Sequence, residues 1–277
     1  MISVVQLGTV DYATGLRLQE KLVGLRKEGS IGDVALLLEH TPVITLGRNA
    51  KTSNVIASSA LLAQRGVELF DCDRGGDVTF HGPGQLVAYP IFDLRGLSSR
   101  MPNRNTMGVI EFVRNLEEVL IRTCAEFSIP AKRIAGLTGV WTEASNTWGR
   151  APSPVQVEQS STQGENAKIA ALGIHISRGV TSHGIALNVN TDLSFFNLIV
   201  PCGITSKPVT SMQQELGREV SMQDVAHALS RNFGTVFQSQ ILWLDNLEAL
   251  LGPKLGVPMN PPGNLRKLHG EDDITWA

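Results

Sequence analysis

Cys202 and Lys168 are the residues whose types could together perform nucleophilic catalysis. Cys202 lies in Pro-Cys-Gly, where proline restricts and glycine loosens the flanking backbone, so we expect its thiol on an exposed turn. A free thiol with a pKa of about 8.5 is only a few per cent thiolate at neutral pH, and a nearby ammonium would raise that fraction. Lys168 opens an apolar, strand-like run and is the candidate ammonium. The alternatives are that Cys202 is a small buried hydrophobic residue and that Lys168 is a solvated surface charge.

The other two cysteines are predicted to be structural. Cys72 precedes a glycine-rich segment, and Cys124 falls on the apolar stripe of a predicted helix. The three cysteines are odd in number and widely spaced, without a C-x-x-C pair or a histidine at zinc-finger spacing. We therefore expect a reducing compartment and no metal.

The segment RGGDVTFHGPG, residues 74–84, is a candidate binding loop. Its four glycines allow a ligand to approach the main chain closely, and Arg74 and His81 supply polar groups. It lacks the G-K-[ST] of a phosphate-binding loop and the spacing of a dinucleotide fingerprint. The alternatives are a tight hairpin and a structural role for His81.

The run after Lys168 predicts a strand with one small face. His183, Ile185, Leu187 and Val189 alternate with Gly184, Ala186 and Asn188. The small face leaves space for a ligand.

The stretches that must position these residues alternate between strand-like and helix-like patterns, which is typical of an α/β protein. Apolar patterns predict strands at Ile2 to Leu7, Val34 to Glu39, Val43 to Leu46 and Val67 to Phe70, and helices after Asp11, near Leu61, at Thr106 to Phe127 and from Ser221. The stripe of the third helix comprises Val109, Ile110, Val113, Leu120 and Phe127. We predict one domain over residues 1–251, a surface insertion at 143–167 and an irregular tail at 252–277.

Composition restricts the partners. The chain has 277 residues, with 24 basic residues against 26 acidic ones, so its overall field favours neither nucleic acid nor an anionic membrane. No apolar run approaches the length of about 18 residues that spans a bilayer, and the N-terminus does not have the pattern of a signal peptide. We expect a soluble, cytoplasmic monomer.

Five blocks of sequence, in order, resemble the lipoyl or octanoyl transferases. They are HTPVITLGR at 40–48, RGGDVTFHGPGQLVAYPIFDL at 74–94, GLTGVWT at 136–142, KIAALGIHISRGVTSHGIALNVNTDL at 168–193 and IVPCGI at 199–204. The resemblance implies an α/β (α+β) fold like that of biotin and lipoate protein ligases, a mixed, mostly antiparallel sheet with flanking helices.

The resemblance also implies the chemistry. Cys202 would carry octanoate as a thioester and Lys168 would lower the pKa of that thiol and shuttle protons, with His183 in support. Three segments would line the acyl group: Arg74, Gly75, Gly76, Asp77, Val78, Thr79, Phe80 and His81; Ala171, Leu172 and Gly173; Gly184, Ile185 and Ala186.

The implied donor is octanoyl-acyl carrier protein. The implied acceptors are lysines on lipoyl domains of 2-oxoacid dehydrogenase complexes and on the glycine cleavage H protein, in the first step of endogenous protein lipoylation. No cofactor is implied, because the thioester is already activated.

The sequence departs from this family at 143–167, where a shorter turn is usual, and in its long tail. Three other functions stay open. They are an ATP-dependent lipoate or biotin ligase, an amidotransferase between lipoyl-bearing proteins, and a non-catalytic acyl-binding or carrier-docking module.

Overall fold

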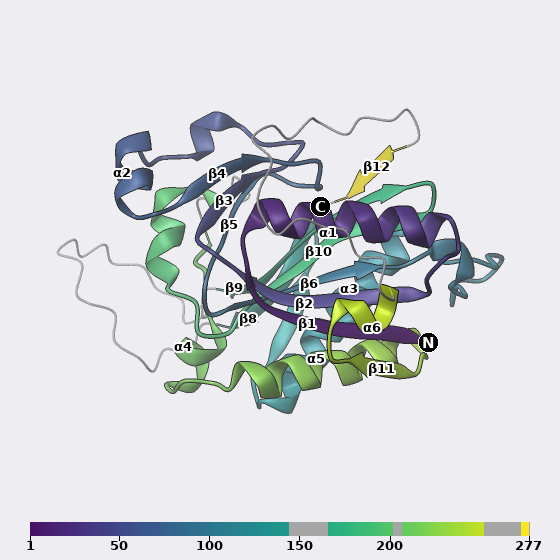
Figure 1. Ribbon diagram of the computed structural model, residues 1–277. Helices are drawn as coiled ribbons and strands as arrows, with labels where there is room; N and C mark the ends of the chain where they lie inside the picture. Colours follow the sequence, from purple (N-terminus) through teal and green to yellow (C-terminus); the bar gives the residue numbers. More distant parts are fainter. Residues whose placement is uncertain (144–165, 202–206, 252–272, 277) are drawn as a thin grey trace.

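The fold is built on a mixed sheet of nine strands. The computed structural model describes residues 1–143, 166–201, 207–251 and 273–276 (Figure 1). Across the large sheet, the strands run in the order β11 (Ile241–Leu244), β1 (Ile2–Val10), β2 (Asp33–His40), β6 (Gln85–Ile91), β10 (Val180–Asn188), β9 (Asn166–Ser177), β8 (Leu137–Glu143) and β7 (Ala131–Ile134). The strand β12 (Asp273–Trp276) also pairs with β9.

The pairing confirms the predicted fold class. β1 pairs in parallel with β2 and β11, whereas the other neighbours in the large sheet are antiparallel. The tail at 252–277, expected to be irregular, contributes the strand β12.

A second sheet of three strands lies beside the first and leads into the glycine-rich segment. Its order is β4 (Glu68–Asp71), β3 (Val43–Leu46) and β5 (Val78–His81). Apolar side chains from β3 and β5 pack against Leu198 and Ile199, which extends this smaller core towards the end of the described segment 166–201.

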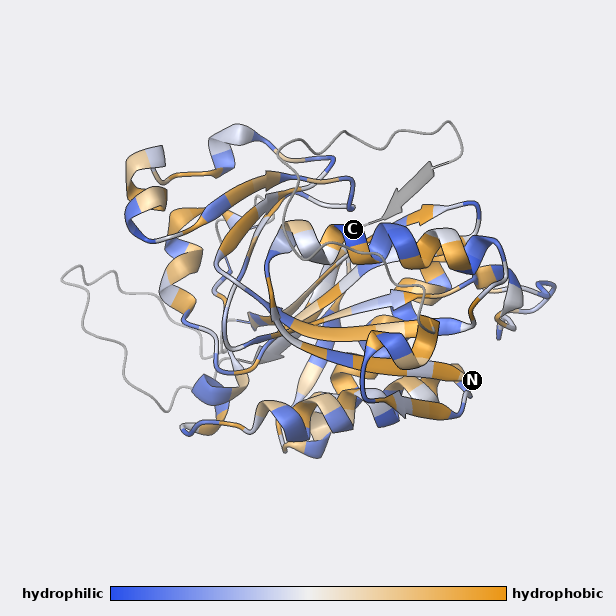
Figure 2. Cartoon of the chain, viewed as in Figure 1, coloured by the Kyte–Doolittle hydropathy of each residue, from blue (hydrophilic) through white to orange (hydrophobic). Residues whose placement is uncertain are grey.

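Helices cover both faces of the large sheet. α1 (Tyr12–Lys27) packs on one face, and α3 (Val109–Glu126) and α5 (Met222–Phe237) pack together on the other (Figures 1 and 2). Asp11 and Ser221 accept backbone N–H bonds at the starts of α1 and α5, so both predicted helix starts are confirmed. The shorter helices are α2 (Ser59–Gln64), α4 (Met212–Leu216), α6 (Leu247–Leu251) and the 3-10 turns Thr52–Asn54, Leu94–Gly96 and Leu193–Leu198.

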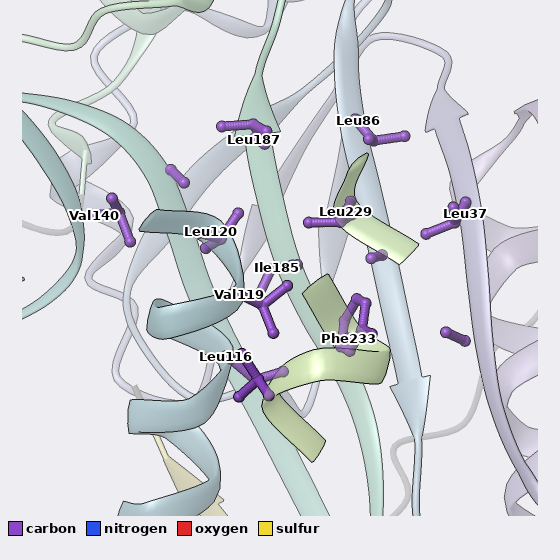
Figure 3. Close-up of a cluster of buried hydrophobic side chains, with 14 of the residues drawn as sticks. Leu37, Leu86, Leu116, Val119, Leu120, Val140, Ile185, Leu187, Leu229 and Phe233 are labelled. Carbon is purple, nitrogen blue, oxygen red and sulfur yellow. The ribbon is translucent and has the colours of Figure 1, made fainter. Parts of the chain in front are cut away.

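The main core lies between the large sheet and the pair α3 and α5. Figure 3 shows Leu116 and Leu120 from α3 and Phe233 from α5 packed against Ile185 and other sheet residues. Cys124 is fully buried in this cluster, as predicted. Ile110 was expected on the same apolar stripe, but it is 59% exposed, because residues 109, 113, 116 and 120 already fill the inward face of the helix.

β10 largely follows the predicted alternation. Ile185 and Leu187 face the main core, and Ala186 faces α1. The exception is His183, which was expected to share a face with Ile185. Its φ of +55° rotates the chain, and its imidazole lies on the same side of the sheet as Tyr89. In the ranges that the structure covers, we find no helix with the length and apolar character needed to cross a membrane.

Candidate active site

A cavity of about 380 Å³ lies where α1, the small sheet and the large sheet meet. Its walls comprise Tyr12, Asn49, Arg74, Gly76, Asp77, Thr79, His81, Val87, Tyr89, Gly136, Leu137, Thr138, Lys168, Ala171, Leu172, Gly173, His183, Gly184, Ile185 and Ala186. Asn49 and Gly136 are exposed and Tyr12, Tyr89 and His183 are buried, so the cavity has an outer mouth and a buried end.

Most of the residues singled out in the sequence line this cavity, from segments more than a hundred positions apart. Among the candidates that the structure describes, the exceptions are Gly75, Val78 and Phe80. Val78 and Phe80 point into the smaller core because alternate residues of β5 face opposite sides. Gly75 uses its N–H and carbonyl in bonds to Ile174 and Arg74. The segment 74–84 is not a hairpin, because its tight turn at residues 82–84 leads from β5 in the small sheet to β6 in the large sheet.

Lys168 reaches the cavity because of an irregularity in β9. Val140 pairs with Ala170 but Trp141 pairs with Lys168, so β9 carries one extra residue at Ile169. Such a bulge re-aims side chains, and here both Lys168 and Ala171 line the cavity. Lys168 is 8% exposed, and its Nζ lies 5.3 Å from the centre of the Trp141 ring.

Arg74 is a buried cation that shapes the loop at the cavity wall. Its guanidinium donates to Thr45 Oγ1 and to the carbonyls of Thr45, Gly75 and Asp77, at 2.7 to 3.1 Å. These hydrogen-bond partners, all within the described part of the chain, are neutral oxygens. A planar fork of donors suits such a cluster of carbonyls, and it fixes the loop 74–77 while adding positive charge to the cavity.

Asp73 contacts His183, at the buried end of the cavity, and also His175. Its Oδ1 accepts from His183 Nε2 at 2.6 Å, and its Oδ2 lies 3.4 Å from His175 Nδ1. Burial alone would raise the pKa of Asp73, but the bond and charge of His183, aided by His175, lower it to about 2. The positive φ of His183 is secured by its backbone N–H, which donates to Gln19 Oε1 at 2.6 Å.

Gly184 is small for a reason different from the one expected. The small face of β10 was expected to leave space for a ligand. A side chain at Gly184 would instead place its Cβ 2.2 Å from the carbonyl oxygen of Ala88 and 2.5 Å from Pro90. The missing side chain therefore allows β6 and β10 to approach closely.

Both tyrosines of the chain line the cavity, and neither was singled out in the sequence, although Tyr89 lies within the block at 74–94. Tyr12 stacks on His81 with ring centres 6.3 Å apart, and Tyr89 Oη lies 2.6 Å from His40 Nε2. Burial raises the pKa of both phenols. Their rarity is the signal that the sequence offered, since a residue type used only twice marks two positions for attention.

His40 and His81 are neutral in the folded protein. Burial, the largest cause, lowers the pKa of His40 to about 4 and that of His81 to about 3. His40 Nδ1 donates to the Val10 carbonyl at 2.7 Å, so its Nε2 accepts from Tyr89. His81 Nδ1 donates to Gln85 Oε1 at 2.7 Å, and Gln85 in turn donates to Asn188 at 2.9 Å.

Cys202 lies outside the described residues. Its neighbour Pro201 is described, and with Lys168, Ala171 and Ala186 it lines a smaller cavity next to the main one. Of the other cysteines, Cys72 is half-buried and its thiol donates to the Leu46 carbonyl at 3.4 Å. Burial raises the pKa of Cys124 to about 12. Within the described part of the chain, we find no cluster of three or more His, Cys, Asp or Glu residues that could hold a metal ion.

Comparison with known sequences identifies a catalytic family. Residues 11–234 match the family described as the lipoyl protein ligase A/B catalytic domain. An octanoyltransferase from Koribacter versatilis is 56% identical over 274 residues, covering 99% of each chain. Another from Acidobacterium capsulatum is 50% identical over 91% of this chain and 96% of the relative.

Comparison with solved structures supports the fold. A bi-partite lipoate protein ligase from Thermoplasma acidophilum superposes with a TM-score of 0.63 at 16% identity, covering 90% of this chain and 88% of the other. A lipoate-protein ligase A bound with ATP gives 0.61 at 14% identity, with coverages of 88% and 87%. At such low identity these likenesses concern the fold alone.

Proposed function

Because this chain belongs to the octanoyltransferases of the lipoyl protein ligase A/B catalytic domain family, we propose that it transfers octanoate from octanoyl-acyl carrier protein to lysines of lipoyl domains. The acceptors are the lipoyl domains of 2-oxoacid dehydrogenase complexes and the glycine cleavage H protein. The chemistry is acyl transfer, and Cys202 carries the octanoyl group between donor and acceptor.

The observation that carries this proposal is the cavity with Lys168 in its wall. Its volume of about 380 Å³ falls in the range of about 300 to 1,000 Å³ that is typical of small-molecule sites. Val87, Ala171 and Ala186 provide apolar surface for a hydrocarbon chain. Pro201, the residue before Cys202, lines the adjoining smaller cavity with Lys168, which supports a shared role for the cysteine and the lysine.

The first half-reaction loads the enzyme. The Cys202 thiolate attacks the carbonyl carbon of the octanoyl thioester, a new C–S bond forms, and the C–S bond to the carrier breaks. The Lys168 ammonium gives its proton to the departing carrier thiolate. Main-chain N–H groups near the reacting carbonyl stabilise the oxyanion.

The second half-reaction transfers the octanoyl group from Cys202 to the acceptor. The lysine of the lipoyl domain attacks the acyl-enzyme as a neutral amine, an amide C–N bond forms, and Cys202 leaves as a thiolate. Lys168, now neutral, accepts the proton of the attacking amine and returns to its starting state. No ATP is consumed, because the thioester supplies the activation.

Intact-mass spectrometry after mixing with octanoyl-acyl carrier protein tests the proposal. We expect one octanoyl adduct on Cys202, which disappears when a lipoyl domain is added. Cys202→Ala abolishes the adduct, and Cys72→Ala, a matched change at another unpaired thiol, retains it. An adduct that maps to Cys72 or Cys124 contradicts the mechanism.

The same assay separates the other functions. Octanoylation from free octanoate that requires ATP indicates a ligase, and loading from an octanoylated lipoyl domain in preference to the carrier indicates an amidotransferase. A protein that binds the carrier or the acyl chain but forms no adduct with any donor is a binding module.

A further inference from the structure

The motif GLTGVWT lines part of the cavity mouth, but the proposed function gives no role to its second glycine, Gly139. This residue has a φ of +131°, a conformation that side-chain-bearing residues rarely adopt. Gly139 lies in β8, directly beside the bulge of β9 that turns Lys168 into the cavity.

The side chain of Lys168 lies against the bare backbone of Gly139. A Cβ built on Gly139 would lie 2.6 Å from Lys168 Cε, 3.4 Å from Lys168 Nζ and 3.0 Å from the carbonyl oxygen of Ala170. A contact below about 3.0 Å is not tolerated, so any larger residue would displace the end of the lysine side chain or shift β9. The Trp141 ring lies near the same ammonium, with Nζ 5.3 Å from its centre.

The backbone of Gly139 is itself anchored from the core side of the sheet. Its N–H donates to Oε1 of Glu117 at 3.3 Å, and the Glu117 side chain on α3 is fully buried. Oε2 of that carboxylate accepts from Arg114 at 2.7 Å and from Arg133 at 3.0 Å. The two arginines compensate the buried charge, so the carboxylate is held in one place.

These contacts connect Glu117 on α3, through Gly139 on β8, to Lys168 on β9. A lysine side chain has four rotatable bonds and loses about 2 kcal/mol of conformational freedom when it is fixed. Lys168 is held at its backbone as well, where its N–H donates to Pro208 and its carbonyl accepts from Thr210. Because Gly139 has no side chain, the flexible end of the Lys168 side chain can lie against its backbone.

We propose that Gly139 and Glu117 are positioning residues for the reaction, which place the ammonium of Lys168 through the contact of Gly139 with Lys168 Cε. The inference rests on the proposed function, in which that ammonium acts on Cys202. Neither residue lines the cavity. Their effect on catalysis is transmitted through the position of the lysine.

Two variants with matched controls test this. Gly139→Ala adds the clashing Cβ, and Gly66→Ala also adds a methyl at a positive φ but with no atom within 4 Å of the new Cβ. Glu117→Gln keeps the size of the side chain but weakens the acceptor for Gly139. Glu118→Gln removes the neighbouring carboxylate, which forms ion pairs with Arg122 and Arg133.

We expect Gly139→Ala to lower kcat about 100-fold, as for a displacement of about 1 Å in a catalytic group, with KM for the acyl donor changed less than threefold. The pH profile of Cys202 alkylation should shift towards a free thiol, with a pKa of about 8.5. Glu117→Gln should lower kcat by up to about tenfold. It should also shift the pH profile of Cys202 alkylation in the same direction as Gly139→Ala does. Both controls should resemble the wild type.

The outcomes are separable. If Gly139→Ala does not fold, as judged by circular dichroism, the comparison of Glu117→Gln with Glu118→Gln decides the question. Folded variants with wild-type kcat and an unchanged alkylation profile overturn the positioning role, as does an equal effect in Glu118→Gln. If the wild type itself forms no octanoyl adduct on Cys202, the proposed function has failed instead.

Discussion

One carboxylate, Asp73, contacts two histidines, of which His183 lines the buried end of the cavity. It bonds His183 at 2.6 Å and lies 3.4 Å from His175, and a pKa of about 2 keeps it charged at neutral pH. His183 also has a positive φ, a conformation that costs free energy for residues other than glycine. The carboxylate therefore helps to hold a strained residue in the cavity wall.

Asp73→Asn should lower the free energy of unfolding at pH 7 by about 1 to 3 kcal/mol, because a charge-assisted hydrogen bond in a largely buried site is replaced by a weaker one. Urea denaturation measures this change. Asp71→Asn, at an exposed position in β4, is the control and should stay within about 0.5 kcal/mol of the wild type. Equal stabilities for the two variants would show that the contact of Asp73 with His183 contributes nothing.

At the scale of elements, the strand pair β8 and β9 combines regular pairing with one defect. The bulge opposite Val140 and Trp141 sends both Lys168 and Ala171 to the cavity side, which strict alternation would not permit. The helices on the other face supply rigidity to this pair, since α3 carries Glu117 and packs against α5.

Phe233→Ala in α5 should lower the free energy of unfolding by about 3 to 5 kcal/mol, because it leaves a cavity where the ring contacts Phe92 and Phe237. Ile110→Ala on α3 removes an apolar side chain that is 59% exposed, and it should change stability by less than about 0.5 kcal/mol. Chemical denaturation of the two variants checks the assignment of the inward faces. A large loss for Ile110→Ala would contradict it.

Local patterns were sufficient for much of this architecture. The apolar pattern after Asp11 predicted α1, and the alternation of Ile185 and Leu187 predicted β10. Long-range contacts were beyond such patterns. Tyr89 faces the cavity through its bond to His40, and the unusual backbone of His183 depends on Gln19, 164 positions away.

The site was predictable where it consists of contiguous motifs and not where it is assembled from single residues. Arg74 and His81 stood out because glycines surround them, and Lys168 because it opens an apolar run. Asp73 lies directly before that motif, yet only the fold shows that its carboxylate meets His183. Gly139 lies within the motif GLTGVWT, but its proposed role in positioning Lys168 depends on a positive φ that the sequence does not reveal.

For the whole molecule, the buried histidines predict sensitivity to mild acid. His40 and His81 have folded-state pKa values of about 4 and about 3, below the ordinary value of 6.5, so the unfolded chain binds protons at a higher pH than the native protein. Stability therefore decreases as the pH falls below about 6.5, by about 1.4 kcal/mol per pH unit for each histidine.

Urea denaturation between pH 6 and pH 5 measures this slope, which should be about 3 kcal/mol per unit for the two histidines together. His40→Gln should halve the slope, because glutamine can still donate to the Val10 carbonyl but does not titrate. His40→Gln combined with His81→Gln should remove it. A flat wild-type profile in this range would mean that neither histidine is neutral when buried.

The pairing of Glu143 with Asn166 has a practical consequence for engineering. These residues are opposite each other in β8 and β9, which holds their Cα atoms about 5 Å apart. Doubling the length of a flexible connection adds only about 0.6 kcal/mol to the cost of closing it. A fluorescent reporter whose own termini are adjacent can therefore be inserted between these two strands with little strain on either of them.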